Sequence, residues 1–183
     1  MPLRRVVVYC GSSPGSHGEY VDTAQALGRT LAERDIELVY GGAKVGTMGA
    51  IADAALEAGG RVIGVIPSTL VEMEVAHEGL SELHEVETMH ERKALMLELS
   101  DGAITLPGGH GSLDELFEAL AWLQLGIHSI PIGLLNVRGY YDHLLAHLDH
   151  ARGEGFLAPD HHELLLVEKD ANQLLDLMAR FRS

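Results

Sequence analysis

The residues best placed to do chemistry lie in the segment LPGGHGSLDELFEALAW, from Leu106 to Trp122, where an apolar strand pattern is followed by an apolar helix pattern. Three glycines here would let the backbone approach a ligand, and the helix start would offer free N–H groups and a positive dipole end to an anion. Glu115 follows within one turn, so the segment could be an anion pocket with a carboxylate beside it. The alternative is a capped turn, because Ser112 and Glu115 also have the spacing of a capping box, worth about 1 kcal/mol.

A second segment, ETMHERKALMLELS, combines a helix start with two cations. Thr88 and Glu91 have capping-box spacing. Arg92 and Lys93 then stand in or beside the first turn, where positive side chains oppose the helix dipole. Arg92 also shares the inward stripe of apolar residues that recur at helical spacing. A cation placed against both the dipole and the core indicates an anionic ligand, and a snorkelling arginine or an internal ion pair is the alternative.

Strand and helix patterns alternate along the chain and predict the scaffold for these residues. We expect strands at Arg5–Cys10, Glu37–Tyr40, Arg61–Ile66, Leu83–Val86, Ala103–Leu106, Ile130–Leu135 and Leu164–Val167. We expect helices near Tyr20–Arg34, Met48–Ala58, Met89–Leu99, Ser112–Leu125, Tyr140–Gly153 and Ala171–Arg182. Strand runs such as VVVYC barely alternate, as strands covered on both faces do. Residues 1–183 are therefore expected to form a single α/β domain, a Rossmann-like, doubly wound and mainly parallel sheet with helices on both faces.

The glycine-rich loops lie where ligands bind in such folds, at the carboxyl ends of the strands. The first strand runs into CGSSPG, the second into YGGAKVGTMG and the fifth into LPGGHGS. One such loop is ordinary turn chemistry, whereas three in one small domain favour a phosphate-bearing ligand. Because sequential strands usually lie close together, the helices after the fourth and fifth strands should bring Arg92 and Glu115 to one crevice. A guanidinium, a carboxylate and glycine-lined amides would suit a phosphorylated sugar.

Composition limits the partners of this chain. Its 183 residues are 46% apolar, which is enough for one compact domain, and they carry a formal net charge of −14 at pH 7. This acidic balance disfavours nucleic acid polymers and anionic membranes as partners, and no segment has the length and hydropathy of a bilayer span. Cys10 is the only cysteine, so no intrachain disulfide can form, and we expect a cytoplasmic protein.

Several segments partly match familiar motifs but lack the neighbouring residues or strands that those motifs require. CGSSPG contains G-x-S-x-G around Ser13, but it follows the first strand, so the earlier oxyanion loop of a serine hydrolase is missing. GGAKVGT lacks the Lys-Ser/Thr pair of a P-loop, and no G-x-G-x-x-G follows the first strand. His143, His147 and His150 would align on one helix face, but without H-E-x-x-H or a paired carboxylate we interpret them as a solvated face. We therefore expect neither a metal nor a cofactor.

The two charged segments together resemble a known family. MHERKALM and PGGHGSLDE are similar to the paired signatures M-x-x-R-K and P-G-G-x-G-T-x-x-E of the Lonely Guy (LOG) family, which are cytokinin riboside 5′-monophosphate phosphoribohydrolases. The likeness extends to CGSSPG, VYGG, MGAIADAALEAGGRVIGVIP and WLQLGIHSIPIGLLNVRGYYDHLL, and so covers nearly the whole chain. Family members have also carried the label lysine decarboxylase, yet none of the three lysines, Lys44, Lys93 and Lys169, lies in a recognisable pyridoxal-phosphate motif.

The resemblance implies a hydrolase that cleaves the N-glycosidic bond of an adenine-type nucleoside 5′-monophosphate, as an AMP nucleosidase does, and releases the base and ribose 5-phosphate. It implies that Glu115 stabilises the sugar cation or activates water, and that Arg92 orients the nucleotide through its phosphate or base. Glu74 falls at a family glutamate that contacts substrate, although an exposed loop charge is its alternative. The other substrate-binding residues that we expect are Lys93, Gly108, Gly109, His110, Gly111, Ser112, Gly11, Ser12, Ser13, Gly41, Gly42 and Met89.

The chain departs from the family pattern at Ser112, Ala43, Thr47 and Ala121, where threonine, glycine, leucine and threonine are usual. A hydroxyl missing near the ligand at Ala121 leaves the base preference open between prenylated cytokinin nucleotides and plain AMP. The helix around Ala121 is apolar almost all round, which predicts full burial and, with the habit of the family, a homodimer. Two other functions stay open: a non-catalytic carrier of a phosphorylated ligand, and a transferase that passes the phosphoribosyl group to an acceptor other than water. A carboxylate beside an anion favours the enzyme over the carrier.

Overall fold

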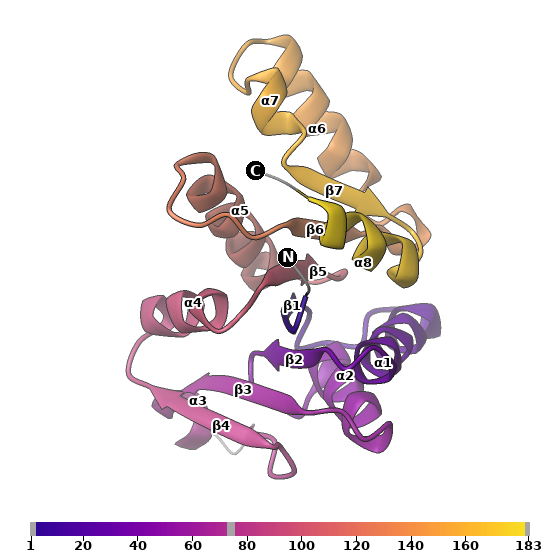
Figure 1. Cartoon of the computed structure of the whole chain (residues 1–183), viewed down its shortest axis with the longest axis vertical. Helices are drawn as coiled ribbons and strands as arrows, with labels where there is room; N and C mark the ends of the chain where they lie inside the picture. The colour runs from indigo at the N-terminus through magenta and orange to yellow at the C-terminus, as the bar shows by residue number, and fades with distance from the viewer. Residues whose placement is uncertain (1–2, 73–75, 182–183) are drawn as a thin grey trace.

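The computed structural model describes residues 3–72 and 76–181, which form a seven-stranded parallel sheet flanked by helices (Figure 1). The strands are β1 (Arg5–Tyr9), β2 (Glu37–Tyr40), β3 (Val62–Pro67), β4 (Glu82–Val86), β5 (Gly102–Thr105), β6 (Ile132–Leu135) and β7 (Leu165–Glu168). Their order across the sheet is β4-β3-β2-β1-β5-β6-β7, and every neighbouring pair is parallel. The predicted α/β class with a parallel, doubly wound sheet is confirmed.

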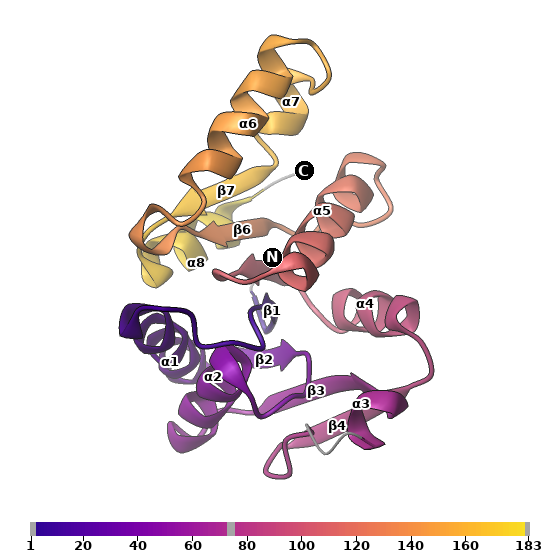
Figure 2. The ribbon, with the colours of Figure 1, turned by 180° about the vertical axis from the view of Figure 1, so that it is seen from behind.

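The helices form a layer on each face of the sheet. The longer ones are α1 (Gly18–Glu33), α2 (Gly46–Glu57), α4 (Met89–Glu98), α5 (His110–Gln124), α6 (Asp142–Gly153) and α8 (Ala171–Arg180). The sequence patterns missed three short elements, because so few residues carry no helical periodicity; these are α3 (Ser68–Glu72), η1 (Val137–Gly139) and α7 (Pro159–His162). α1, α2 and α8 cover one face, and α4, α5 and α6 cover the other (Figures 1 and 2).

Alternation along the central strand supplies the two halves of the core. Val6 and Val8 of β1 belong to the cluster under α1, α2 and α8, which includes Leu27. Val7 belongs to the opposite cluster, with Met96 of α4. All five side chains are almost completely buried, and burial of each stabilises the fold by about 1.5–3 kcal/mol. Because both faces are covered, the strand reads as one continuous apolar run in the sequence.

The strand order reverses beside β1, which pairs with β2 on one side and with β5 on the other. The expectation that the fourth and fifth strands lie close together is wrong, because β3, β2 and β1 separate β4 from β5. α4, which connects those two strands, crosses back over the sheet and packs mainly on β3. The loops after β1 and β5 leave in opposite directions from such a switch point, and the crevice between them is the usual ligand site of open α/β sheets.

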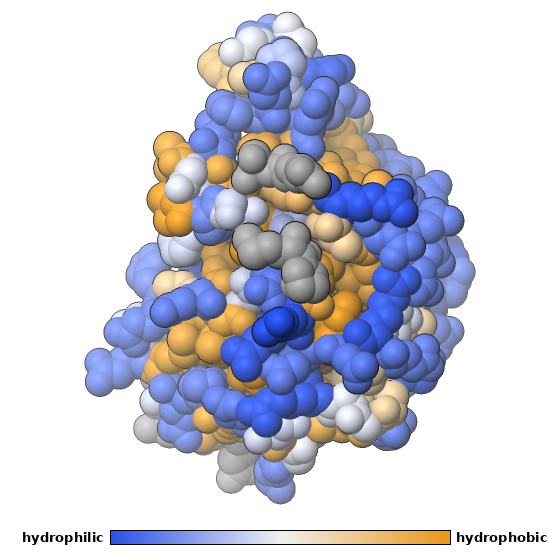
Figure 3. Space-filling view, in the orientation of Figure 1, coloured by the Kyte–Doolittle hydropathy of each residue, from blue (hydrophilic) through white to orange (hydrophobic). Residues whose placement is uncertain are grey.

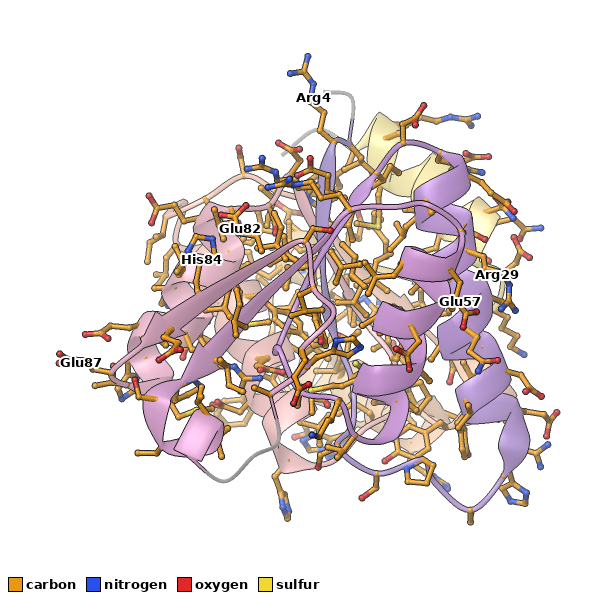
Figure 4. The ribbon with its side chains drawn as sticks, turned by 90° about the horizontal axis from the view of Figure 1, so that it is seen from below. Arg4, Arg29, Glu57, Glu82, His84 and Glu87 are labelled. Carbon is orange, nitrogen blue, oxygen red and sulfur yellow. The ribbon has the colours of Figure 1, made fainter. Side chains whose placement is uncertain are left out.

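The amino ends of the strands, at the far edge of the sheet from this crevice, carry a chain of ion pairs. Arg5 and Arg61 both contact Glu37, and Arg61 also pairs with Glu82. His84 lies 2.7 Å from Glu82, and Figure 4 shows the two side chains close together on β4. These groups are partly exposed, so each pair contributes only about 0–1 kcal/mol.

Candidate active site

A cavity of about 390 Å³ opens at the carboxyl ends of β1, β2 and β5. Its more polar wall comprises Gly11, Ser12, Gly41, Arg92, Gly109, His110, Gly111, Ser112 and Glu115. Its apolar wall comprises Val8, Cys10, Ala43, Val45, Met48, Leu70 and Met96. The first turn of α5 lies at this cavity, and a helix start binds anions through its free amides and dipole. The arrangement suits a ligand with an anionic group at one end and a flat or apolar group at the other.

Arg92 is fixed in the cavity wall by two backbone carbonyls. α4 begins at the predicted Thr88–Glu91 capping box, which places Arg92 in its first turns facing inward. Its Nε donates to Val65 O and its Nη2 donates to Gly41 O, both at 3.1 Å. A side chain at Gly41 would displace the guanidinium, because a Cβ there would lie 2.0 Å from Nη2. The third nitrogen, Nη1, lies 3.9 Å from Glu115 Oε1. The internal ion pair that the sequence left open is therefore present, and because Arg92 also lines the cavity, an anionic ligand for it stays a prediction.

Glu115 is not a helix cap. α5 begins at His110, two residues earlier than predicted, with Gly109 as its N-cap and no side-chain cap hydrogen bond. The predicted capping box of Ser112 and Glu115 is therefore wrong. Ser112 instead packs in the first turn against Gly108, where a Cβ would lie 2.1 Å from the serine Oγ. Glu115 is left as a carboxylate that is only 8% exposed and lines the cavity.

The electrostatic surroundings of Glu115 suit proton transfer near neutrality. Burial raises its pKa to about 7. The positive charges of Arg92 and Lys93 lower this pKa but do not offset the burial, and Asp114 and Glu118 raise it further. A carboxyl group that exchanges its proton near pH 7 is matched to general acid–base work. Such a group in a cavity beside a specific charge partner is a candidate catalytic residue.

Lys93 follows Arg92 in the sequence. Its side chain is buried but does not line the cavity. Its Nζ donates to Asp114 Oδ2 at 2.9 Å and to Glu118 Oε2 at 2.5 Å. Burial lowers the pKa of Lys93, but the two ion pairs outweigh burial and leave that pKa raised. The lysine is therefore charged and committed to two carboxylates of α5.

A smaller hollow of about 290 Å³ adjoins the cavity, and the loops after β1 and β5 line both. Two consecutive tyrosines after β6 hold the β5 loop. Tyr140 Oη donates to Gly108 O, and Tyr141 Oη donates to Leu106 O, both at 2.7 Å. These bonds fix the carbonyls on either side of Pro107, so the glycine loop enters α5 in a defined orientation.

The structure brings most of the predicted site residues together. Nine of them form the polar wall of the cavity described above. Two more line the adjoining hollow, namely Ser13 and Gly108. Three line neither space, namely Lys93, Gly42 and Met89. Met89 is exposed, with its Sδ 3.9 Å from Arg92 Nη1, and the predicted Glu74 lies outside the described residues.

Two departures from the family pattern have different surroundings. Thr47 is buried and ties α2 to the β1 loop, since its Oγ1 accepts from Gly11 N at 2.9 Å and donates to Gly11 O at 3.0 Å. Ala121 is exposed on α5 and lines a separate small groove with Leu148 and Leu157. Ala121 therefore does not line the cavity within one chain, contrary to the expectation that this position lies near the ligand.

That apolar wall is the part of the site that the sequence interpretation missed. Val8 and Cys10 stand at the carboxyl end of β1, where the switch-point rule could have placed them. Met96 lies one turn after Arg92 on the inward stripe of α4, and Met48 lies in the first turn of α2. These apolar residues come from β1, α2 and α4 and the loops beside them, and the fold brings them together around the charged pair.

Comparison with known proteins identifies the family. Residues 48–178 match the profile of a family described as "Possible lysine decarboxylase". A probable cytokinin riboside 5′-monophosphate phosphoribohydrolase of Oryza sativa subsp. japonica is 50% identical, over 98% of this chain and 79% of its own. The chain belongs to the Lonely Guy family. A family member from Rhodococcoides fascians, a cytokinin riboside 5′-monophosphate phosphoribohydrolase, is 49% identical over 91% of this chain and 85% of its own.

Solved structures of low sequence identity share the fold. The molybdenum cofactor carrier protein of Chlamydomonas reinhardtii superposes with a TM-score of 0.72 at 19% identity, covering 96% of each chain. The molybdenum cofactor binding protein of Rippkaea orientalis also reaches 0.72, at 22% identity, over 97% of this chain and 96% of its own. At such low identity the likeness extends to the fold alone.

The decarboxylase description of the family does not fit the site of this member. Pyridoxal phosphate is held as a Schiff base by a lysine, and none of the three lysines lines the cavity. His143, His147 and His150 lie exposed on α6, and the described part of the chain gathers no group of three or more metal-ligating side chains.

Within residues 3–72 and 76–181, no helix has the length and apolar character needed to cross a membrane.

Proposed function

We propose that this Lonely Guy family member hydrolyses the N-glycosidic bond of adenine-type nucleoside 5′-monophosphates, cytokinin nucleotides included, to the free base and ribose 5-phosphate. The observation that carries the proposal is the buried Arg92–Glu115 pair, which lines a cavity at the switch point of the sheet. The relatives named as cytokinin riboside 5′-monophosphate phosphoribohydrolases support the substrate class.

The cavity offers each part of the nucleotide a suitable wall. The backbone amides of Gly109–Ser112, at the start of α5, would bind the 5′-phosphate, with the hydroxyls of Ser12 and Ser13 beside them. Met48 and Met96 would contact the face of the base, since thioethers pack well on aromatic rings. In this placement the ribose lies between the two ends, next to Glu115.

The carboxyl group of Glu115 would carry the chemistry. Breaking the C1′–N bond leaves its electron pair on the base and positive charge on the ribose. The Glu115 carboxylate would stabilise that charge and accept a proton from the water that attacks C1′. The departing base takes up one proton, so the proton that water releases is balanced by the one that the base gains.

Arg92 would orient the nucleotide and keep Glu115 partly ionised. Two of its three nitrogens are occupied by Val65 O and Gly41 O, so its position does not depend on the ligand. Nη1 remains for a phosphate or base oxygen or nitrogen. The same positive charge lowers the pKa of Glu115 against the effect of burial, which keeps a useful fraction of carboxylate at neutral pH.

We also propose a cytoplasmic homodimer. The composition of α5 predicted a helix that is buried on all sides. Within one chain this prediction is wrong, because Phe117 is 39% exposed. Leu125 and Ile127 at its end are 71% and 62% exposed, and apolar side chains gather over this end of α5 at the left of Figure 3. A second copy would remove that surface from water. The acidic charge and the single cysteine suit the cytoplasm.

Base release from purified protein tests the proposed activity. AMP and isopentenyladenosine monophosphate are incubated separately with the enzyme, and free base is measured by chromatography. Loss of release in both Glu115→Gln and Arg92→Ala supports the proposal. A folded protein that releases no base from either nucleotide would instead favour a carrier of a phosphorylated ligand.

A further inference from the structure

We propose that Lys93 is a positioning residue: it links α4 to α5 through Asp114 and Glu118 and so fixes the separation of Arg92 from Glu115. This inference rests on the proposed function of that pair. It replaces a role for Lys93 in phosphate binding, which the family signature alone would allow.

The geometry places the link directly around the catalytic pair. Lys93 follows Arg92 in α4, while Asp114 precedes Glu115 in α5 and Glu118 follows it by three residues. Asp114 and Glu118 are four residues apart, so they are neighbours on one face of α5. The ammonium of Lys93 bonds both of them, at 2.9 and 2.5 Å.

The two helices need such a link because they rest on different strands. α4 packs mainly on β3, whereas α5 packs on β1, β5 and β6. The switch point lies beneath the gap between them, so small independent shifts of the helices would change the 3.9 Å separation of Arg92 Nη1 and Glu115 Oε1. Misplacement of a catalytic group by about 1 Å can cost about 10²-fold in rate.

The surroundings of Lys93 disfavour direct contact with a substrate phosphate. Its side chain is 7% exposed, and two of its three N–H donors are engaged by carboxylates. The partners differ in burial, since Glu118 is 21% exposed and Asp114 is 61% exposed. We therefore expect Glu118 to be the stronger partner, because solvent screens the outer pair more.

The test compares Lys93→Met and Lys93→Arg with Lys169→Met, a matched removal of an exposed lysine that does not line the cavity. A positioning role predicts that Lys93→Met lowers kcat by about tenfold to a hundredfold, with partial recovery in Lys93→Arg. The KM for AMP and the inhibition constant of ribose 5-phosphate should change less than about threefold. A phosphate-binding role predicts the reverse, with both constants weakened about tenfold or more, and that result would overturn the proposal.

Glu118→Gln supplies an independent arm that keeps the lysine. Positioning predicts a fall in kcat similar to that of Lys93→Met and no further fall in the double variant. Unchanged or increased activity in Glu118→Gln, where Lys93 keeps only Asp114 as an ion-pair partner, would contradict positioning. Hydrogen exchange of α4 and α5 amides should rise in both variants and not in Lys169→Met. This last measurement needs no activity, so it tests the link even if the wild-type protein releases no base and the proposed function fails.

Discussion

Arg92 Nη1 and Glu115 Oε1 lie 3.9 Å apart, and the side chains of both residues are about nine-tenths buried. The pair joins two helices that follow non-adjacent strands, β4 and β5. Burial of the carboxylate is only partly offset by the arginine, because the pKa of Glu115 remains raised. A carboxyl group held in this state is costly to the fold and useful for chemistry.

The activity should rise with pH through the titration of Glu115. If the carboxylate is the reactive form, kcat at saturating AMP should increase between pH 6 and 8 with a midpoint near the Glu115 pKa of about 7. Saturating substrate removes the contribution of nucleotide binding. A kcat that stays flat from pH 5.5 to about 8.5 would contradict this role for the carboxylate.

The stability of the fold should fall as pH rises from about 4.5 through about 7. The folded-state pKa of Glu115 is raised from its ordinary 4.5 to about 7, so the folded protein holds this proton longer than the unfolded chain. Stability from this group is complete below pH 4.5 and is lost as pH rises through 7, by roughly 3 kcal/mol at most. Glu115→Gln keeps a neutral side chain, so its advantage in urea or thermal unfolding should grow from pH 5 to 8. Glu57→Gln, an exposed change on α2 (Figure 4), should show no such trend.

Gly41→Ala should inactivate the enzyme by displacing the Arg92 side chain. The new Cβ would lie 2.0 Å from Arg92 Nη2, so the guanidinium must leave its carbonyl partners and its place beside Glu115. We expect kcat/KM to fall nearly as far as in Arg92→Ala, with the circular dichroism spectrum retained. Gly153→Ala, in open space at the end of α6, is the control and should keep full activity. An active Gly41→Ala enzyme would mean that Arg92 does not need this position.

Much of the scaffold was predictable, because strands covered on both faces give unmistakable apolar runs and glycine loops mark their carboxyl ends. The start of α5 could not be predicted in this way. Ser112 and Glu115 have the residue types and spacing of a capping box, but the helix begins at His110 with Gly109 as its N-cap. Local spacing cannot decide between two possible caps three residues apart; the packing of Ser112 on Gly108 decides it.

The meeting of Arg92 and Glu115 was predicted for a wrong reason. Adjacent strands were expected to bring them together, whereas β4 lies at the sheet edge and α4 returns over β3. Strand order depends on the whole chain, so it cannot be predicted from the two segments alone. The ion-pair partners of Lys93, Asp114 and Glu118, could not be predicted for the same reason, because they depend on how the two helices are placed.

The exposed side of α5 should be covered in solution. Light scattering at micromolar concentration should give the mass of two chains. Phe117→Glu places a charge on the exposed apolar face and should shift the protein toward a monomer, while the exposed Glu57→Gln should not. A monomeric wild-type protein would contradict the dimer.

The measurement that tests the central claim most directly is base release by wild type, Glu115→Gln and Arg92→Ala, with Glu57→Gln as the control. Each folded protein is given AMP and isopentenyladenosine monophosphate, and free base and ribose 5-phosphate are quantified together. The account predicts equal amounts of both products from wild type and control, with a loss of at least about 10²-fold in the two site variants. Release that survives in Glu115→Gln would contradict it, because the buried carboxylate would then have no part in breaking the glycosidic bond.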